Sequence, residues 1–159
     1  MEQRTSIDIE APVAPVWALM RDVERWPEWT ASVRSVTLLD GALRVGARAR
    51  IDQPRLPTTV WSVTGLTEGH DFTWEASGPG TLTTARHGVE ATGPGTCRAT
   101  LSITWSGWLG SVVGRGYRSL TDRYLAMEAA GLKARAEWGG DPATHRERPD
   151  APGSDAGAS

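Results

Sequence analysis

The chain has 159 residues, of which 39% are hydrophobic and 23% are charged, a balance typical of a single soluble globular domain. Four of its 19 acidic and two of its 17 basic residues lie beyond residue 138, so the preceding part carries equal numbers of each sign. A balanced surface does not favour nucleic acid or an anionic membrane as a partner. The single cysteine, Cys97, excludes an internal disulfide and a cysteine-rich metal site.

Neither an export signal nor an apolar run long enough for a membrane span is visible, since such a span needs roughly 18 consecutive apolar residues. We therefore expect a cytoplasmic protein. Lys133 is the only lysine among the 17 basic residues, and this preference for arginine favours a bacterial source.

The N-terminal part predicts one strand and two short helices. Residues 5–10 alternate polar and apolar, which predicts a strand with Ile7 and Ile9 facing inward. Apolar residues then recur at helical spacing over residues 13–20, and a second short helical segment is expected over 24–33.

Between residues 34 and 106 the apolar residues recur with a period of two. This pattern predicts six strands, at 34–40, 47–53, 59–67, 70–77, 81–91 and 97–106. Short turns rich in glycine, proline and aspartate separate them, so the strands should form antiparallel hairpins. Together with the first strand they predict a curved seven-stranded antiparallel sheet with one covered apolar face.

The cover is predicted to be a long C-terminal helix over residues 109–138, which would span roughly 45 Å and cross the sheet. Residues 1–138 are expected to form one domain, and 139–159, rich in glycine, proline and alanine, a disordered tail. Glycines in the first third of the helix suggest that the mouth of an enclosed cavity opens there. The residues expected on the sheet-facing side are Leu109, Val113, Gly116, Tyr117, Leu120, Tyr124, Met127 and Gly131.

Several short motifs follow one another over about residues 5–138. They are Ile9-Glu10-Ala11-Pro12, the segments 22–29 and 56–64, Phe72-Thr73-Trp74, His87 before Gly95-Thr96, and Ala130-Gly131-Leu132-Lys133. Their order and spacing resemble the START-like or SRPBCC superfamily, in its polyketide cyclase/dehydrase and lipid-transport branch. The resemblance implies an α+β helix-grip fold, in which the sheet and the long helix enclose an apolar cavity. It does not imply one activity, because the superfamily includes cyclases, hydrolases, lipid carriers and binding proteins.

His87 is the candidate catalytic residue, because it is the only ionisable side chain that clear strand alternation turns inward. An imidazole can exchange a proton near neutral pH, as a cyclase needs when it removes a proton next to a carbonyl. Tyr117 and Tyr124 could donate hydrogen bonds to the resulting enolate oxygen. The alternative, which is the more common situation, is a neutral core histidine bonded to a tyrosine hydroxyl or a backbone carbonyl.

Tryptophans on the strands are expected to form an aromatic wall around a ligand, although they could instead fill the core and close the cavity. The residues expected to bind the ligand are Trp29, Trp61, Trp74, His87, Val89, Leu101, Ile103, Trp105, Val113, Tyr117, Leu120 and Tyr124.

No cofactor is expected. The three histidines lack metal-ligand spacing, and no glycine-rich turn precedes a helix that could bind phosphate. The first hypothesis is therefore a protein that binds a small hydrophobic ligand, such as a lipid, an isoprenoid or an aromatic polyketide. The alternative is a polyketide cyclase/dehydratase with His87 as general base, and a third interpretation is a module that acts on lipid-bearing partner proteins. Both a monomer and a homodimer fit the pattern.

Overall fold

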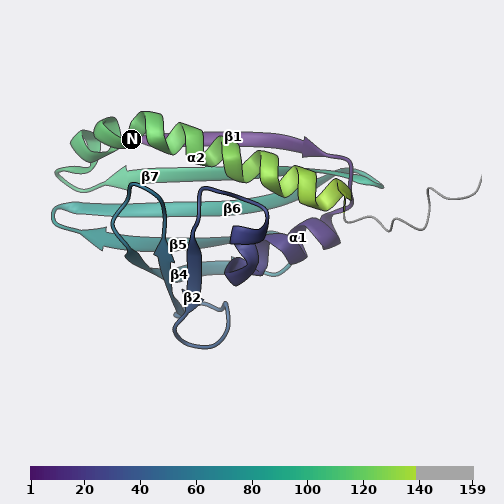
Figure 1. Cartoon of the computed structure of the whole chain (residues 1–159), viewed down its shortest axis with the longest axis horizontal. Coiled ribbons are helices and arrows are strands. Elements are labelled where there is room, and N and C mark those ends of the chain that lie inside the picture. The colour runs from purple at the N-terminus through teal and green to yellow at the C-terminus, as the bar shows by residue number, and fades with distance from the viewer. Residues whose placement is uncertain (139–159) are drawn as a thin grey trace, which may run out of the picture.

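A computed structural model describes residues 1–138, and Figure 1 shows a long helix lying across one face of an antiparallel sheet. The strands are β1 (Glu2–Ile9), β2 (Ser35–Leu38), β3 (Arg48–Asp52), β4 (Thr59–Thr67), β5 (Asp71–Gly78), β6 (Thr81–Gly93) and β7 (Thr96–Ser106). The helices are α1 (Val13–Arg21), the 3-10 helix η1 (Val23–Glu28) and α2 (Gly110–Trp138). The predicted α+β helix-grip architecture is confirmed. The tail predicted over 139–159 lies outside the described residues.

The seven strands form one sheet in the order β1-β7-β6-β5-β4-β3-β2, and every neighbouring pair is antiparallel. The chain therefore meanders from β2 to β7, and β1 pairs along the far edge of β7. The pairing shifts register between Val63 and Gly65 and again between Ala91 and Gly93. Such bulges bend strands locally, which helps the sheet curve around the helix.

The hydrophobic core lies between the inner face of the sheet and the helices. Inward residues of β5 and β6, among them Phe72, Trp74 and Val89, are almost fully buried. Helix α2 packs on β1, β7 and β6, whereas α1 and η1 lie toward the end of α2 (Figure 1). The turn into α2 needs Gly107, which has a φ of 90° and approaches the carbonyl of Gly80 too closely for a Cβ atom.

The observed strands end within a few residues of their predicted limits, but the second helical segment differs. The helix predicted over 24–33 is a 3-10 helix that ends at Glu28. Pro27 has no backbone N–H for a continued helix. The backbone N–H groups of Trp29 and Thr30 both donate to the carbonyl of Trp26, which closes the turn.

The sheet-facing side of α2 is also rotated relative to the prediction. Gly110 and Gly114 touch Trp105 so closely that an added Cβ would lie about 3.0 Å from it. This contact turns the glycines toward the sheet and leaves Tyr117 40% exposed. The buried residues of α2 are Gly110, Gly114, Tyr124, Leu125, Glu128, Ala129, Leu132 and Ala136.

Across residues 1–138 no helix combines the length and the apolar composition that a membrane crossing requires.

Candidate functional site

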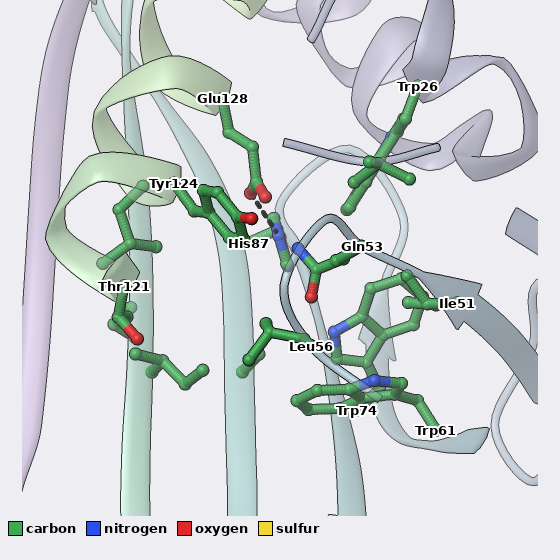
Figure 2. A pocket seen from close by; sticks show the side chains of 15 residues that line it. Trp26, Ile51, Gln53, Leu56, Trp61, Trp74, His87, Thr121, Tyr124 and Glu128 are labelled. Atoms are coloured by element: carbon green, nitrogen blue, oxygen red, sulfur yellow. Dashed lines mark ion pairs between the residues drawn. The ribbon is translucent and has the colours of Figure 1, made fainter. Parts of the chain in front are cut away.

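A cavity of about 70 Å³ lies between the inner face of the sheet and α2 (Figure 2). Its lining comes from η1, the five strands β3 to β7, α2 and two connecting segments. Most of these side chains are apolar, and the polar ones come from β6, β7, α2 and the β3–β4 loop. The lining residues are Trp26, Val33, Ile51, Gln53, Leu56, Trp61, Trp74, Ala85, His87, Ser102, Ile103, Thr121, Tyr124, Leu125 and Glu128.

Three tryptophans form the aromatic part of this lining. Trp74 is central, because its ring lies 5.5 Å from that of Trp26 and 5.9 Å from that of Trp61. A hydrogen bond holds Trp26 in place, since its indole N–H donates to the backbone carbonyl of Met20 at 3.0 Å. Strand alternation turns Trp61 and Trp74 inward, where they meet Trp26 of η1. The period of the strands could not predict Trp26, because it lies on a helix.

His87 lies on the inner face of β6 and is 6% exposed, so the predicted orientation of this side chain is confirmed. Its ring stacks on Phe72 at 4.8 Å and lies 4.9 Å from the ring of Trp26. Within residues 1–138 its Nδ1 atom has no hydrogen-bond partner. Neither a tyrosine hydroxyl nor a backbone carbonyl within these residues bonds to Nδ1.

Glu128 of α2 faces His87 across the cavity, and sequence analysis missed it. The side chain is 7% exposed, and its Oε2 atom lies 3.7 Å from Nε2 of His87. Ser32 donates a hydrogen bond to the other carboxylate oxygen, Oε1, at 3.0 Å, and the Thr30 hydroxyl lies 2.9 Å from that of Ser32. The spacing of Glu128 from Thr121, Leu125 and Leu132 would have been the signal, because all four lie on one side of the helix.

The β3–β4 loop forms the other polar border of the cavity. The Tyr124 hydroxyl donates to the backbone carbonyl of Pro54, which ties the loop to α2. Gln53 donates to the carbonyl of Ser32 at 3.3 Å, and Leu56 points toward the cavity (Figure 2). Arg55 has a φ of 64°, so this loop contains a left-handed backbone position without a glycine.

The structure brings together some of the residues expected to bind a ligand and separates others. Trp61, Trp74, His87, Ile103 and Tyr124 line the cavity. The others lie elsewhere: Val89, Leu101 and Trp105 are buried but outside the lining, Val113 and Leu120 are half-buried, Tyr117 is more exposed, and Trp29 lines a separate surface groove.

The arrangement can hold an apolar molecule and present an acid–base pair to one side of it. Within residues 1–138 no group of three or more His, Cys, Asp or Glu side chains converges as a metal site would require. The polar groups in the lining of the described cavity are the imidazole of His87, the carboxyl of Glu128, the amide of Gln53 and the hydroxyls of Ser102, Thr121 and Tyr124.

A curved sheet gripped by a long helix, with a partly apolar cavity between them, defines a START-like protein of the helix-grip class. The chain belongs to the family described as "Polyketide cyclase / dehydrase and lipid transport", whose model matches residues 2–137. The resemblance recognised in the sequence motifs is thereby confirmed. No curated protein sequence matches the chain.

Solved structures with the same fold include two described as aromatase/cyclases. The Zhui aromatase/cyclase from a Streptomyces species superposes with a TM-score of 0.73 at 12% identity, covering 90% of this chain and 97% of that one. The di-domain ARO/CYC protein BexL superposes with a TM-score of 0.68 at 18% identity, and the match covers 89% of this chain but 48% of BexL. A START superfamily protein from Mycobacterium smegmatis superposes with a TM-score of 0.66 at 14% identity, over 84% of this chain and 97% of that one. At these identities the likeness shows the fold alone.

Proposed function

We propose that the protein binds a small hydrophobic molecule in the cavity between the sheet and α2. The observation that carries the proposal is the wall formed by Trp26, Trp61 and Trp74 beside a space that the side chains leave unfilled. Aromatic and aliphatic linings with a few converging polar groups are typical of small-molecule sites. The family's description, which includes lipid transport, supports the same function.

The volume of the cavity restricts the part of a ligand that can enter it. About 70 Å³ lies well below the roughly 300–1,000 Å³ typical of drug-sized ligands. The cavity as it stands therefore accommodates one small group, such as a branched alkyl end. A larger ligand requires the β3–β4 loop or α2 to move outward, and the remainder of the ligand then lies toward that opening.

A fluorescence titration tests the proposal directly, because three tryptophans line the cavity. The purified protein is titrated with an isoprenoid alcohol, a short fatty acid and an aromatic polyketide, and tryptophan emission is followed. We expect a saturable change with at least one of these classes. A flat response to all of them would contradict the proposed function.

A cavity-filling variant locates the binding. Ala85→Leu adds three carbon atoms to a residue that lines the cavity, and we expect it to weaken binding by about tenfold or more. Ser62→Leu makes an equally large change at an exposed position of β4 and should leave the affinity unchanged. Equal affinities of the two variants would place the ligand elsewhere.

A second candidate function is a cyclase/dehydratase, and the convergence of His87 and Glu128 specifically favours it. Neutral His87 would remove a proton from a carbon next to a ketone, and the electron pair would move to the ketone oxygen as an enolate. The enolate carbon would attack a second carbonyl and form the new carbon–carbon bond. The imidazolium would return its proton to the resulting alkoxide, after which loss of water yields the dehydrated ring.

In that reaction the Glu128 carboxylate would stabilise the imidazolium, and the Gln53 amide could donate to the enolate oxygen. Tyr124 can donate to the enolate oxygen only if its hydroxyl releases the carbonyl of Pro54. The test is turnover of a poly-β-ketone substrate by the native protein and by His87→Ala. Turnover that survives in His87→Ala would exclude this mechanism.

A further inference from the structure

The cavity lining contains one acidic side chain and no arginine or lysine. Among the 15 lining residues Glu128 is the only one with a carboxyl group. Every other charged side chain near the cavity would have to act through protein or solvent. A ligand in this cavity therefore meets one potential negative charge and no fixed positive charge.

Within the described residues, one hydrogen bond and one longer contact reach the Glu128 carboxylate. Ser32 donates one hydrogen bond to Oε1, but Oε2 is 3.7 Å from Nε2 of His87, which is longer than a hydrogen bond. A carboxylate that is 7% exposed loses most of its hydration, and this loss is costly unless a cation or several donors replace the water. A further donor or positive charge at Oε2 would therefore stabilise the site.

The aromatic lining suits a positive charge as well. The ring of Trp74 lies 5.5 Å from that of Trp26 and 5.9 Å from that of Trp61, and Tyr124 of α2 lines the same cavity. The faces of tryptophan rings attract organic cations within about 6 Å, and desolvation of the cavity strengthens this attraction. Apolar substituents on the cation bury area against the same rings.

We propose that the preferred ligand is a small hydrophobic organic cation, a substituted amine or quaternary ammonium whose charge lies between Oε2 of Glu128 and the tryptophan rings. This inference rests on the proposed binding function and specifies its ligand class. A positive charge on His87 would compete with the ligand for the same carboxylate. The remaining apolar part of the ligand lies toward the β3–β4 loop.

A pair of isosteres tests the charge preference alone. Phenyltrimethylammonium and tert-butylbenzene have nearly the same shape, but only the first is a cation. Both are titrated into the full-length protein by calorimetry at about pH 8, above the usual titration range of histidine. We expect the cation to bind about tenfold or more tightly than the neutral compound.

Two variants assign the preference to Glu128. Glu128→Gln keeps a side chain that can accept the Ser32 hydrogen bond but removes the charge, and the preference for the cation should fall to nearly onefold. Glu90→Gln removes the same charge from an exposed position of β6 and should retain the preference. Thermal melting of both variants confirms that each is folded.

The outcomes separate the two proposals. If both isosteres bind the native protein equally, the cavity binds hydrophobic molecules but the inference about charge is wrong. Tighter binding of the neutral compound also overturns it. If neither isostere binds and the lipid, isoprenoid and polyketide titrations are flat as well, the proposed function itself fails. A preference that persists in Glu128→Gln would place the cation away from this carboxylate and would also contradict the inference.

Discussion

Oε2 of Glu128 lies 3.7 Å from Nε2 of His87, and the two side chains reach this position from α2 and from β6, both of which line the cavity. Both side chains are less than 10% exposed. A charged or polar pair in such surroundings interacts through a medium of lower effective dielectric constant than water. The pair should therefore link the helix to the sheet energetically.

We predict measurable coupling between these two residues in a double-mutant cycle. His87→Phe, Glu128→Gln and the double variant are unfolded with urea, and the interaction free energy is obtained from the four free energies of unfolding. We expect roughly 1 kcal/mol or more, as for other contacting buried pairs. The salt bridge between Arg98 and Asp8 is shorter, at 2.8 Å, but exposed, so its cycle should show weaker coupling. Stronger coupling in the exposed pair would contradict this prediction.

Tyr124→Phe should loosen the β3–β4 loop. The substitution removes the hydroxyl that donates to the carbonyl of Pro54 and leaves the ring in place. We expect a loss of about 0.5–1.5 kcal/mol in the free energy of unfolding and faster amide exchange over residues 53–58.

Tyr117→Phe is the matched control, because Tyr117 is 40% exposed and makes no hydrogen bond within residues 1–138. Its effect should stay within about 0.5 kcal/mol. Unchanged exchange in Tyr124→Phe would show that the hydrogen bond does not hold the loop.

These two tyrosines also show which part of the site the sequence could predict. Strand alternation has a period of two and two sharply different faces, so it placed His87, Trp61 and Trp74 inward without any knowledge of the helix. A helix with glycine, alanine and arginine on several sides has no such contrast. Its rotation depends on the contact of Gly114 with Trp105 of the preceding strand, which helical spacing does not report, so the spacing places Tyr124 on the inner side together with Tyr117.

The remaining polar groups of the site come from segments that carry no periodic signal. Ser32 follows η1 in an irregular stretch, and Gln53 and Leu56 belong to the loop after β3. Their positions depend on the path of the loops that lead into β2 and β4. The local sequence pattern does not predict that path. Glu128 was missed for another reason. The predicted inner side of α2 is offset by about one residue from the observed one, so it includes Met127 and leaves Glu128 out.

Cys97 should remain unreactive in the folded protein. It is completely buried, and burial raises the pKa of its thiol above the ordinary value of 9.0. Since the thiolate is the reactive form, a disulfide reagent should label the native protein far more slowly than the protein in urea.

The raised pKa also sets the sign of a pH effect. The folded state holds the thiol proton more tightly than the unfolded state, so this contribution to stability is present below the unfolded pKa and is lost as the pH rises through the folded pKa. Between neutral and alkaline pH the native protein should lose more stability than Cys97→Ala. An equal loss in both proteins would show that Cys97 does not contribute.

At Gly131, α2 packs against the backbone of Trp29, the residue that follows η1, and Gly131→Ala should destabilise the protein. An added Cβ would collide with the carbonyl oxygen of Trp29, which is backbone and cannot rotate away. The helix must then move outward, and we expect the free energy of unfolding in urea to fall by about 1–3 kcal/mol.

Gly116→Ala is the control within the same helix, because nothing lies within 4 Å of its added Cβ. Alanine favours a helix over glycine by about 1 kcal/mol, so this variant should gain stability. If the two variants had equal stability, the packing of α2 on Trp29 would be looser than the structure describes, and the helix that carries Glu128 would not be fixed at this end.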